Sequence, residues 1–272
     1  MKFTKMHGCG NDFVLINNYT GRLNIENKKE FAQKICNRRL GVGADGLIIM
    51  GKSELETCDI KMEFYNADGT RGEMCGNGAR CLARFAHEEL NLPQAVLETL
   101  AGDVETSFVR DNIYSVKINL PSVERYNVKV LDGKISGDYI ELGEPGVPHF
   151  VYKINFEEMH PEEQYRLAKT IRHDPFFPKG TNVNLYYIKE NVLKIKTFER
   201  GVEDFTLACG TGVSSVDISY LKTQDDGEIT LKNLVEGGEL LVKIKKQGKE
   251  VRDITLIGKT ELVFKGDFKQ EI

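Results

Sequence analysis

Residues 64–78, FYNADGTRGEMCGNG, have a counterpart in residues 198–212, FERGVEDFTLACGTG. In both stretches a cysteine lies eleven residues after the phenylalanine and is followed by Gly-x-Gly. The two cysteines, Cys75 and Cys209, are 134 residues apart, whereas solenoid repeats recur every ~20–50 residues. The pair therefore indicates the duplication of a whole α+β domain that presents one thiol per copy.

The sequence after each cysteine predicts a helix, so each thiol is expected at a helix N-terminus. Unpaired N–H groups and the helix dipole favour the thiolate there and lower the thiol pKa from its usual ~8.5. Two such N-termini that meet from opposite sides form a site for a carboxylate, with the α-carbon of the ligand between the sulfurs. One thiolate would then remove the α-proton while the other thiol protonates the opposite face.

Short strand-like segments dominate the chain, and several alternate apolar and polar residues as half-buried strands do. The expected strands are 2–6, 13–17, 47–50, 60–65, 104–109, 113–119, 139–142, 183–188, 192–198, 239–245, 251–257 and 261–264. Four helices are expected at 27–38, with Asn27 as its cap, and at 76–90, 162–172 and 210–221.

In each half a strand leads to a loop, then to Cys-Gly-x-Gly and then to a helix, so the order of elements repeats with the motif. A break near Leu120-Pro121-Ser122 divides the chain into similar halves. We expect a first half over residues 1–118, completed by the C-terminal strand 260–272, and a second half over residues 119–259.

Composition narrows the class of protein. The chain has 272 residues, 40% hydrophobic and 29% charged, which is ordinary for a soluble globular protein. Its net charge of −4, without a block of like charges, argues against a nucleic-acid partner. Because no apolar run approaches a membrane span and the N-terminus lacks the apolar stretch of a signal peptide, we expect a cytoplasmic protein without a membrane partner.

The other cysteines have no such glycine context. Cys36, Cys58 and Cys81 are interpreted as small buried apolar residues, whereas Cys9 lies in a polar loop and is left open. No His or Cys cluster has zinc spacing, so no metal is expected. Residues 41–46, GVGADG, fit a dinucleotide-binding fingerprint, but they follow a helix and open a strand, so the match is interpreted as accidental.

Polar residues cluster around the two thiol motifs. They are Asn11, Asn66, His149, Asn182, Glu199 and Arg200. Each of these residues alone is weak evidence for a binding site, since a loop asparagine is usually a turn residue. Together they suit a small polar ligand that carries carboxylates and amines, and Arg200 is able to bind a second carboxylate in bidentate fashion.

At these residues the chain resembles the diaminopimelate epimerases, enzymes of the lysine and peptidoglycan pathway that use no metal or organic cofactor. The matching segments are residues 10–13, 39–46, 64–69, 74–80, 182–183, 199–201 and 208–212.

The resemblance implies a homodimer of chains with two pseudo-symmetric α+β domains, each a curved, mainly antiparallel sheet or barrel around a central helix, which close on an amino-acid substrate. It implies catalysis by Cys75 and Cys209, with His149 and Glu199 assisting thiol ionisation. It further implies substrate binding by Asn11, Asn66, Gly76, Asn77, Asn182, Glu199, Arg200, Gly210 and Thr211.

The chain departs from the family pattern at three positions. Val147 stands where many members have asparagine, Gly46 where some carry an amide, and Phe205 where a polar or acidic residue is usual. These changes motivate an alternative substrate within the superfamily, such as histidine or a proline-like amino acid, although Asn77 argues against a proline racemase. A second alternative is a non-catalytic or thiol-redox protein on the same fold.

Overall fold

The computed structural model describes residues 1–269, which form two compact units. The first comprises Met1–Val116 and the C-terminal segment from Gly258, and the second comprises Lys117–Ile257. Residues 270–272 of the expected C-terminal strand lie outside the described residues.

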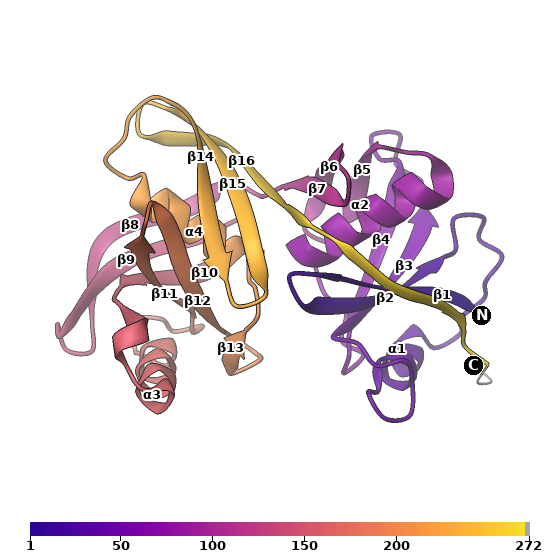
Figure 1. The fold of residues 1–272 in the computed structure, drawn as a ribbon, viewed down its shortest axis with the longest axis horizontal. Helices are drawn as coiled ribbons and strands as arrows, with labels where there is room; N and C mark the ends of the chain where they lie inside the picture. Colours follow the sequence, from indigo (N-terminus) through magenta and orange to yellow (C-terminus); the bar gives the residue numbers. More distant parts are fainter. Residues whose placement is uncertain (270–272) are drawn as a thin grey trace. The chain divides into compact units, whose positions relative to one another are not determined.

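The first unit is a sheet with two helices (Figure 1). Its elements are β1 (Lys2–Gly8), β2 (Asn11–Asn17), α1 (Lys28–Cys36), β3 (Gly46–Lys52), β4 (Ile60–Asn66), α2 (Gly76–Leu90), β5 (Gln94–Thr99), β6 (Gly102–Arg110), β7 (Ile113–Lys117) and β17 (Glu261–Asp267). The strands pair in the order β17-β1-β2-β3-β4-β5-β6-β7, and only the β2–β3 and β4–β5 pairs are parallel.

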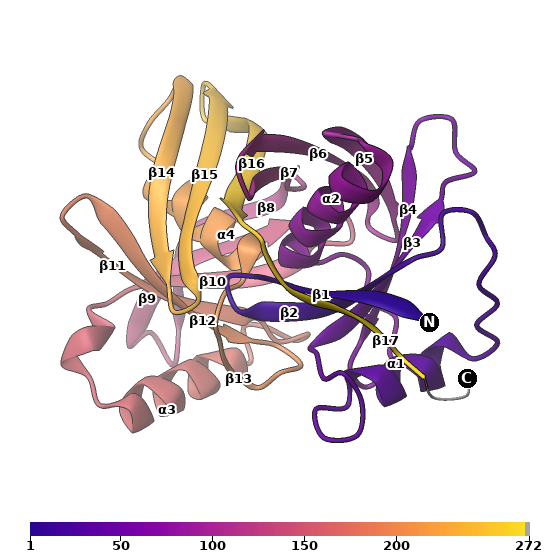
Figure 2. The same ribbon diagram turned by 45° about the vertical axis from the view of Figure 1, so that its right-hand side comes forward.

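Helix α2 lies inside the curve of this sheet, in contact with β1, β2, β3, β5 and β6, while α1 contacts β3 and β4 (Figure 2). Almost every residue from Asn77 to Ala86 is buried, as expected for a helix surrounded by strands. The strands between the two helices are buried on both faces, which explains the continuous apolar run of Leu47–Met50 in β3. The helix ends where Asn91 adopts a left-handed conformation, with φ of 56°.

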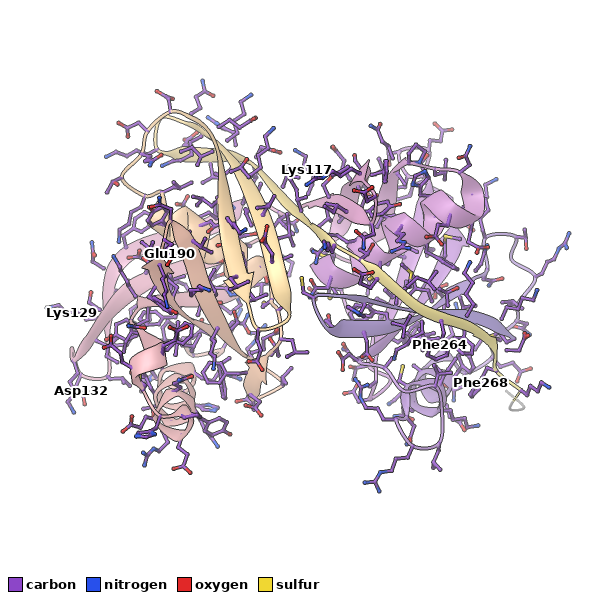
Figure 3. All side chains as sticks on the ribbon, viewed as in Figure 1. Lys117, Lys129, Asp132, Glu190, Phe264 and Phe268 are labelled. Atoms are coloured by element: carbon purple, nitrogen blue, oxygen red, sulfur yellow. The ribbon has the colours of Figure 1, made fainter. Side chains whose placement is uncertain are left out.

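The C-terminal segment completes this sheet because β17 pairs antiparallel with β1. Backbone hydrogen bonds of 2.8 Å join Met1 and Phe268 in both directions. The Phe264 and Phe268 side chains, labelled in Figure 3, pack edge-on against Phe3 and Phe31. Edge-to-face aromatic contacts therefore join residues that are distant in the chain.

The second unit repeats the plan. Its elements are β8 (Pro121–Val130), β9 (Ile135–Leu142), β10 (Val147–Lys153), the 3₁₀ turn η1 (Phe156–Glu158), α3 (Pro161–Arg172), β11 (Asn182–Lys189), β12 (Val192–Glu199), β13 (Asp204–Thr206), α4 (Gly210–Tyr220), β14 (Gly227–Val235), β15 (Gly238–Gln247) and β16 (Glu250–Lys259). Strands β8, β9, β10, β11, β12, β14 and β15 pair in that order, and only β10–β11 and β12–β14 are parallel.

The same sequence of parallel and antiparallel pairs therefore recurs in both units. Even the register repeats: Phe13 faces Gly46 across the first parallel pair, and His149 faces Asn182 across the corresponding pair. Helix α4 contacts β9, β10, β11 and β15, as α2 contacts its own strands, while α3 contacts β11, β12 and β13. The expected fold of two similar α+β halves, each with a central helix, is confirmed.

All four helices lie where the sequence predicts them. Helix α2 matches 76–90, whereas α1 stops at Cys36, two residues before the predicted end. The side chain of Asn37 accepts hydrogen bonds from the N–H groups of Arg39 and Leu40, which turns the chain out of the helix. Asn27 caps α1 as expected, accepting from the N–H of Glu30 at 3.1 Å.

The sequence analysis missed strands β5, β8, β10, β13 and β14. The predicted break near Pro121 is where β8 begins, and the units divide between Val116 and Lys117 instead. The glycine-rich loop 41–46 follows α1 and opens β3, which is the order of elements on which its interpretation as an accidental match rests. Within residues 1–269, no helix combines the length and apolarity needed to span a bilayer.

Candidate active site

Each duplicated cysteine is the N-cap of the helix at the centre of its unit. Cys75 (φ −137°) precedes α2 and Cys209 (φ −121°) precedes α4, both with extended backbone. An α-helix leaves its first N–H groups without intrahelical acceptors, and its dipole places partial positive charge at this end. Each sulfur therefore stands where an anion is favoured.

In the first unit, the thiol of Cys75 faces an amide. Its Sγ lies 3.4 Å from Oδ1 of Asn11, and the same oxygen lies 3.4 Å from Nδ2 of Asn77. Nδ2 of Asn11 donates in turn to a carboxylate oxygen of Asp45 at 2.8 Å. Because a carboxylate can only accept hydrogen bonds, this contact fixes the Asn11 amide with Nδ2 toward Asp45 and Oδ1 toward Cys75.

Asp45 belongs to a charged network. Arg38 contacts both Asp12 and Asp45 at 2.8 Å, and Lys5 forms an ion pair with Asp12 at 2.7 Å. Burial acts to raise the pKa of Asp12, but hydrogen bonds from Arg38 and Lys5 outweigh it and lower that pKa to about 2. Asp12 thus stays ionised at neutral pH, and its ion pairs hold the β2 end that carries Asn11.

Asn66 ends strand β4, and its Nδ2 donates to Oγ1 of Thr70 at 3.0 Å. Its cross-strand neighbour is Gly46, one of the departures from the family pattern. A Cβ at Gly46 would lie 2.6 Å from the ring of Phe64 and 2.8 Å from the carbonyl oxygen of Tyr65. Packing therefore explains the absence of a side chain at this position.

In the second unit, His149 is fully buried on β10. Nδ2 of Asn184 lies 3.3 Å from its Nδ1, and Oδ1 of Asn184 accepts from the hydroxyl of Thr197 at 2.9 Å. Nδ2 of Asn184 also donates to the carbonyl oxygen of Phe150 at 3.2 Å, which assigns the Asn184 amide because a carbonyl oxygen only accepts, so Nδ1 of His149 is an acceptor and Nε2 carries the proton. Burial, reinforced by the charge of Arg200, lowers the pKa of His149 to about 3.

His149 is thus a neutral imidazole whose buried Nε2 has no hydrogen-bond partner among the residues that the structure describes. A buried N–H without an acceptor is unfavourable, so this group is suited to donate to a bound anion. If His149 assists thiol ionisation, as the resemblance implies, it would do so as a neutral hydrogen-bond donor rather than as a cation.

Asn182, Glu199 and Arg200 lie together at the ends of β11 and β12. The backbone N–H of Arg200 donates to Oδ1 of Asn182 at 2.8 Å. The exposed guanidinium of Arg200 contacts the carbonyl oxygen of Lys179 at 3.3 Å. A carboxylate oxygen of Glu199 accepts from the hydroxyl of Thr206. The sequence placed these three side chains in one site, and the structure gathers them within one unit.

At the N-terminus of α4, Sγ of Cys209 lies 3.5 Å from Oγ1 of Thr211. A Cβ at Gly212 would lie 2.4 Å from Oδ1 of Asn184 and 2.8 Å from Oγ1 of Thr197. The last glycine of this motif therefore lets the helix start lie directly on the polar pair that orients His149.

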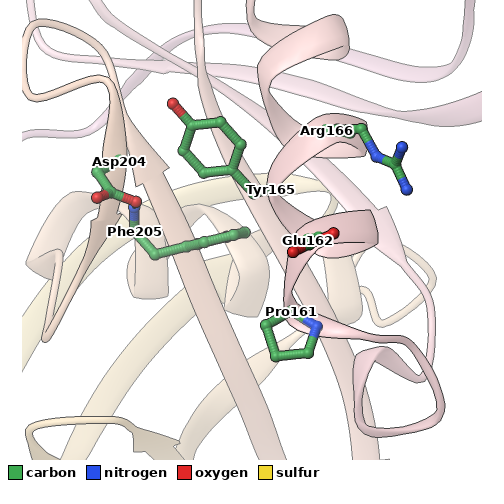
Figure 4. A pocket seen from close by; sticks show the side chains of 6 residues that line it. All are labelled: Pro161, Glu162, Tyr165, Arg166, Asp204 and Phe205. Carbon is green, nitrogen blue, oxygen red and sulfur yellow. The ribbon is translucent and has the colours of Figure 1, made fainter.

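The remaining departures lie on opposite faces of the second unit's sheet. Val147 is two residues from His149 on β10, so it shares the α4 face with the histidine. Phe205 pairs with Phe198, whose ring packs in the core under α3. With α3 residues, Phe205 lines a surface hollow of about 520 Å³ (Figure 4). Of the two, only Val147 is on the face that carries Cys209.

The expected residues therefore form one group in each unit. The first contains Asn11, Cys75, Gly76 and Asn77, while Asn66, in the same unit, contacts Thr70 instead. The second contains His149, Asn182, Glu199, Arg200, Cys209, Gly210 and Thr211. The sequence analysis assigned no role to Asp45, Arg80 or Asn184. Asp45 lies in the loop dismissed as an accidental fingerprint, and Asn184 lies two residues after Asn182, a spacing that places both on one strand face.

Comparison with known proteins decides the family. A family profile described as Diaminopimelate epimerase matches residues 3–125 and 143–263. The chain belongs to the diaminopimelate epimerase family. The diaminopimelate epimerase of Aquifex aeolicus is 38% identical over 100% of this chain and 99% of that protein. That of Clostridium perfringens is 37% identical over 98% of this chain and 99% of that protein.

Solved structures show the same fold at low identity. A phenazine biosynthesis protein of the PhzF family from Bacillus anthracis has a TM-score of 0.73 at 16% identity, covering 98% of both chains. A probable proline racemase from Agrobacterium radiobacter has a TM-score of 0.70 at 14% identity, covering 99% of this chain and 93% of that one. Membership of the diaminopimelate epimerase family makes this chain an amino-acid epimerase, an isomerase, and disfavours the thiol-redox alternative.

Proposed function

We propose that the protein interconverts LL- and meso-diaminopimelate through two cysteine acid/base groups, Cys75 and Cys209. The observation that carries the proposal is the repeated placement of a cysteine as N-cap of the central helix in both units. The family membership supports diaminopimelate as substrate. Two bases suit an inversion because a single base would return the proton to the face that it left.

In this mechanism the α-carboxylate binds at the helix N-termini, where backbone N–H groups of the Gly76 and Gly210 regions also stabilise the charge that develops as the α-proton leaves. One thiolate takes the α-proton, and the other cysteine's S–H gives its proton to the opposite face of the same carbon. The first sulfur ends as a thiol and the second as a thiolate, so no oxidant or reductant is needed.

The polar residues of the two groups would hold the rest of the substrate. Asn11, Asn66 and Asn182 offer amide donors and acceptors for amines and carboxylates. Glu199 carries a carboxylate suited to an ammonium group, and the guanidinium of Arg200 is suited to the distal carboxylate. Nε2–H of His149, buried without an acceptor among residues 1–269, would donate to an anion, either the substrate carboxylate or the Cys209 thiolate.

The decisive experiment incubates the purified protein with LL-diaminopimelate in D₂O and follows both α-deuteration and the appearance of the meso form. Cys75→Ala and Cys209→Ala should each abolish epimerisation. Cys58→Ala, in a buried cysteine outside the motifs, should keep wild-type turnover. Absence of both exchange and isomerisation in the wild type would reject diaminopimelate as substrate, and full activity in both cysteine variants would reject the two-base mechanism.

One observation keeps a second substrate in the test. Val147 lies on the same strand face as His149, at a position where an amide is common in the family. A panel that includes histidine and proline-like amino acids, read by chiral chromatography, separates a racemase of such a substrate from a diaminopimelate epimerase. We further propose that the protein is cytoplasmic and that it forms a homodimer. The molar mass of the purified chain, measured by light scattering, tests the homodimer directly.

A further inference from the structure

The first unit buries an arginine beside its catalytic helix start. Arg80, one turn into α2, is 0% exposed. Its guanidinium donates to the carbonyl oxygen of Gly76 at 3.2 Å and to Oδ1 of Asn77 at 2.6 Å, while its Nε has no hydrogen-bond partner within residues 1–269. These acceptors are the two residues that follow Cys75 directly, so the charge lies under the N-terminus that presents this thiol.

No carboxylate among residues 1–269 is within salt-bridge distance of Arg80. The charges on neighbouring strands are engaged elsewhere, because Lys5 and Asp12 pair with each other and Arg84, on the same helix, pairs with Glu88. The groups that act on Arg80 are thiols: Cys9 from the β1–β2 turn, and Cys75 and Cys81 from the α2 motif. A buried charge without an opposite charge is strongly unfavourable, so the site calls for an anion.

Two of these thiols are unsuited to that role. Burial raises the pKa of Cys9, although the charge of Arg80 acts in the opposite direction. Burial likewise raises the pKa of Cys81 to about 12. Both therefore stay protonated at neutral pH, whereas Cys75 is partly exposed and also lies at the helix N-terminus. Burial lowers the pKa of Arg80, but a guanidinium still keeps its proton at neutral pH.

The second unit lacks this charge. The residue in the same position of its motif is Ser214, whose hydroxyl donates to the carbonyl oxygen of Gly210 at 3.0 Å. Arg80 and Ser214 thus hold matching carbonyls one turn into matching helices, yet only one brings a cation. The two helix starts therefore differ by one buried positive charge, while the guanidinium of Arg200, which acts on His149 in the second unit, is exposed.

Resting on the two-base function proposed above, we propose that Arg80 is a positioning residue that favours the thiolate of Cys75, so that the resting protein holds Cys75 as the base and Cys209 as the acid. In the forward turn the α-proton moves to the sulfur of Cys75 while the S–H proton of Cys209 moves to carbon. The Cys75 thiol then loses its proton and the Cys209 thiolate gains one, which restores the resting form.

The test measures alkylation of each cysteine by iodoacetamide between pH 5 and 10, read by peptide mass spectrometry. The pH midpoint is compared rather than the rate, because Cys75 is more accessible than Cys209. In the wild type, Cys75 should have the lower midpoint by about one unit or more, since an adjacent opposite charge shifts a pKa by ~1–3 units. Equal midpoints, or a lower one for Cys209, would overturn the proposal without any variant.

Variants then assign the effect to the guanidinium. Arg80→Met should raise the Cys75 midpoint by about one unit or more, a tenfold loss of thiolate at neutral pH, and leave Cys209 unchanged. Arg80→Lys should restore most of the difference, whereas Ser214→Ala, the matched change in α4, should move neither midpoint. A folded Arg80→Met with a wild-type Cys75 midpoint would refute the role of the charge.

Alkylation needs no turnover, so the outcome of this test is independent of the outcome of the deuterium-exchange test of the proposed function. Unequal midpoints in a protein that does not exchange deuterium into diaminopimelate would support the role of Arg80 and reject the substrate. Normal epimerisation with equal midpoints would do the reverse. For the rate, Arg80→Met should lower kcat more than it raises KM, because Arg80 is buried away from the substrate.

Discussion

Replacement of Gly212 by alanine tests the placement of α4 on its sheet. The added Cβ would lie 2.4 Å from Oδ1 of Asn184 and 2.8 Å from Oγ1 of Thr197, so both side chains must shift by about 1 Å to reach ordinary contact. Asn184 is fully buried and Thr197 nearly so, and a hydrogen bond of 2.9 Å joins them. The two side chains therefore have no free space into which they could shift together. The same shift disturbs the contact between Asn184 and His149.

The expected cost has two parts. Overpacking in a well-packed core costs about 1–3 kcal/mol, and leaving buried polar groups unsatisfied costs about 1–3 kcal/mol more. Exchange of glycine for alanine within a helix returns at most about 1 kcal/mol. Gly212→Ala should therefore lower the free energy of unfolding of the second unit by about 1–5 kcal/mol.

The duplicated motif supplies a matched control. At Gly78, the same position of α2, the nearest atoms to an added Cβ are Cδ1 of Ile48 at 3.0 Å and Cε of Met62 at 3.4 Å. Both are ends of flexible apolar side chains, so Gly78→Ala should change stability by less than about 1 kcal/mol. Urea unfolding by circular dichroism, with hydrogen exchange read separately in α2 and α4, measures the pair. A Gly212→Ala protein as stable as Gly78→Ala would refute the reasoning.

Two buried groups make stability depend on pH in opposite directions. The pKa of His149 is about 3 in the folded protein and 6.5 in the unfolded chain, so the contribution of its neutral form to stability is complete above pH 6.5 and is lost as pH falls toward 3. Its imidazole signals in NMR should show the Nε2–H form without titration between pH 5 and 8. Burial raises the pKa of Asp217 well above its usual value, with Asn233 as its one hydrogen-bond donor. The stability of the second unit should therefore fall as pH rises above about 4. In urea titrations, Asp217→Asn should raise stability at pH 8 and remove this dependence of stability on pH. An unchanged dependence in the variant would show that Asp217 is not its source.

The sequence predicts the central helices well because their signals are local. Gly-x-Gly after a cysteine marks where each helix begins, and the apolar pattern of residues 76–90 marks its length. The missed strands lack such signals. Pro148 and Gly146 favour a loop where β10 forms, but Pro148 pairs only with β9, since β11 joins the strand at His149. The polar run 124–127 of β8 lies on the surface, where alternation is weak.

By itself, the sequence determined the duplication, the two thiols and the polar residues that accompany them, because motif spacing and residue chemistry are written along the chain. The tertiary structure decided which groups act on these residues. The sequence cannot separate Arg80 from a solvated arginine, since its burial depends on strands that wrap around α2. Nor can it orient the amides of Asn11 and Asn184, because the carboxylate of Asp45 and the carbonyl oxygen of Phe150, which fix them, become neighbours only when the strands pair. Electrostatics depends on distance in space, and only folding sets that distance.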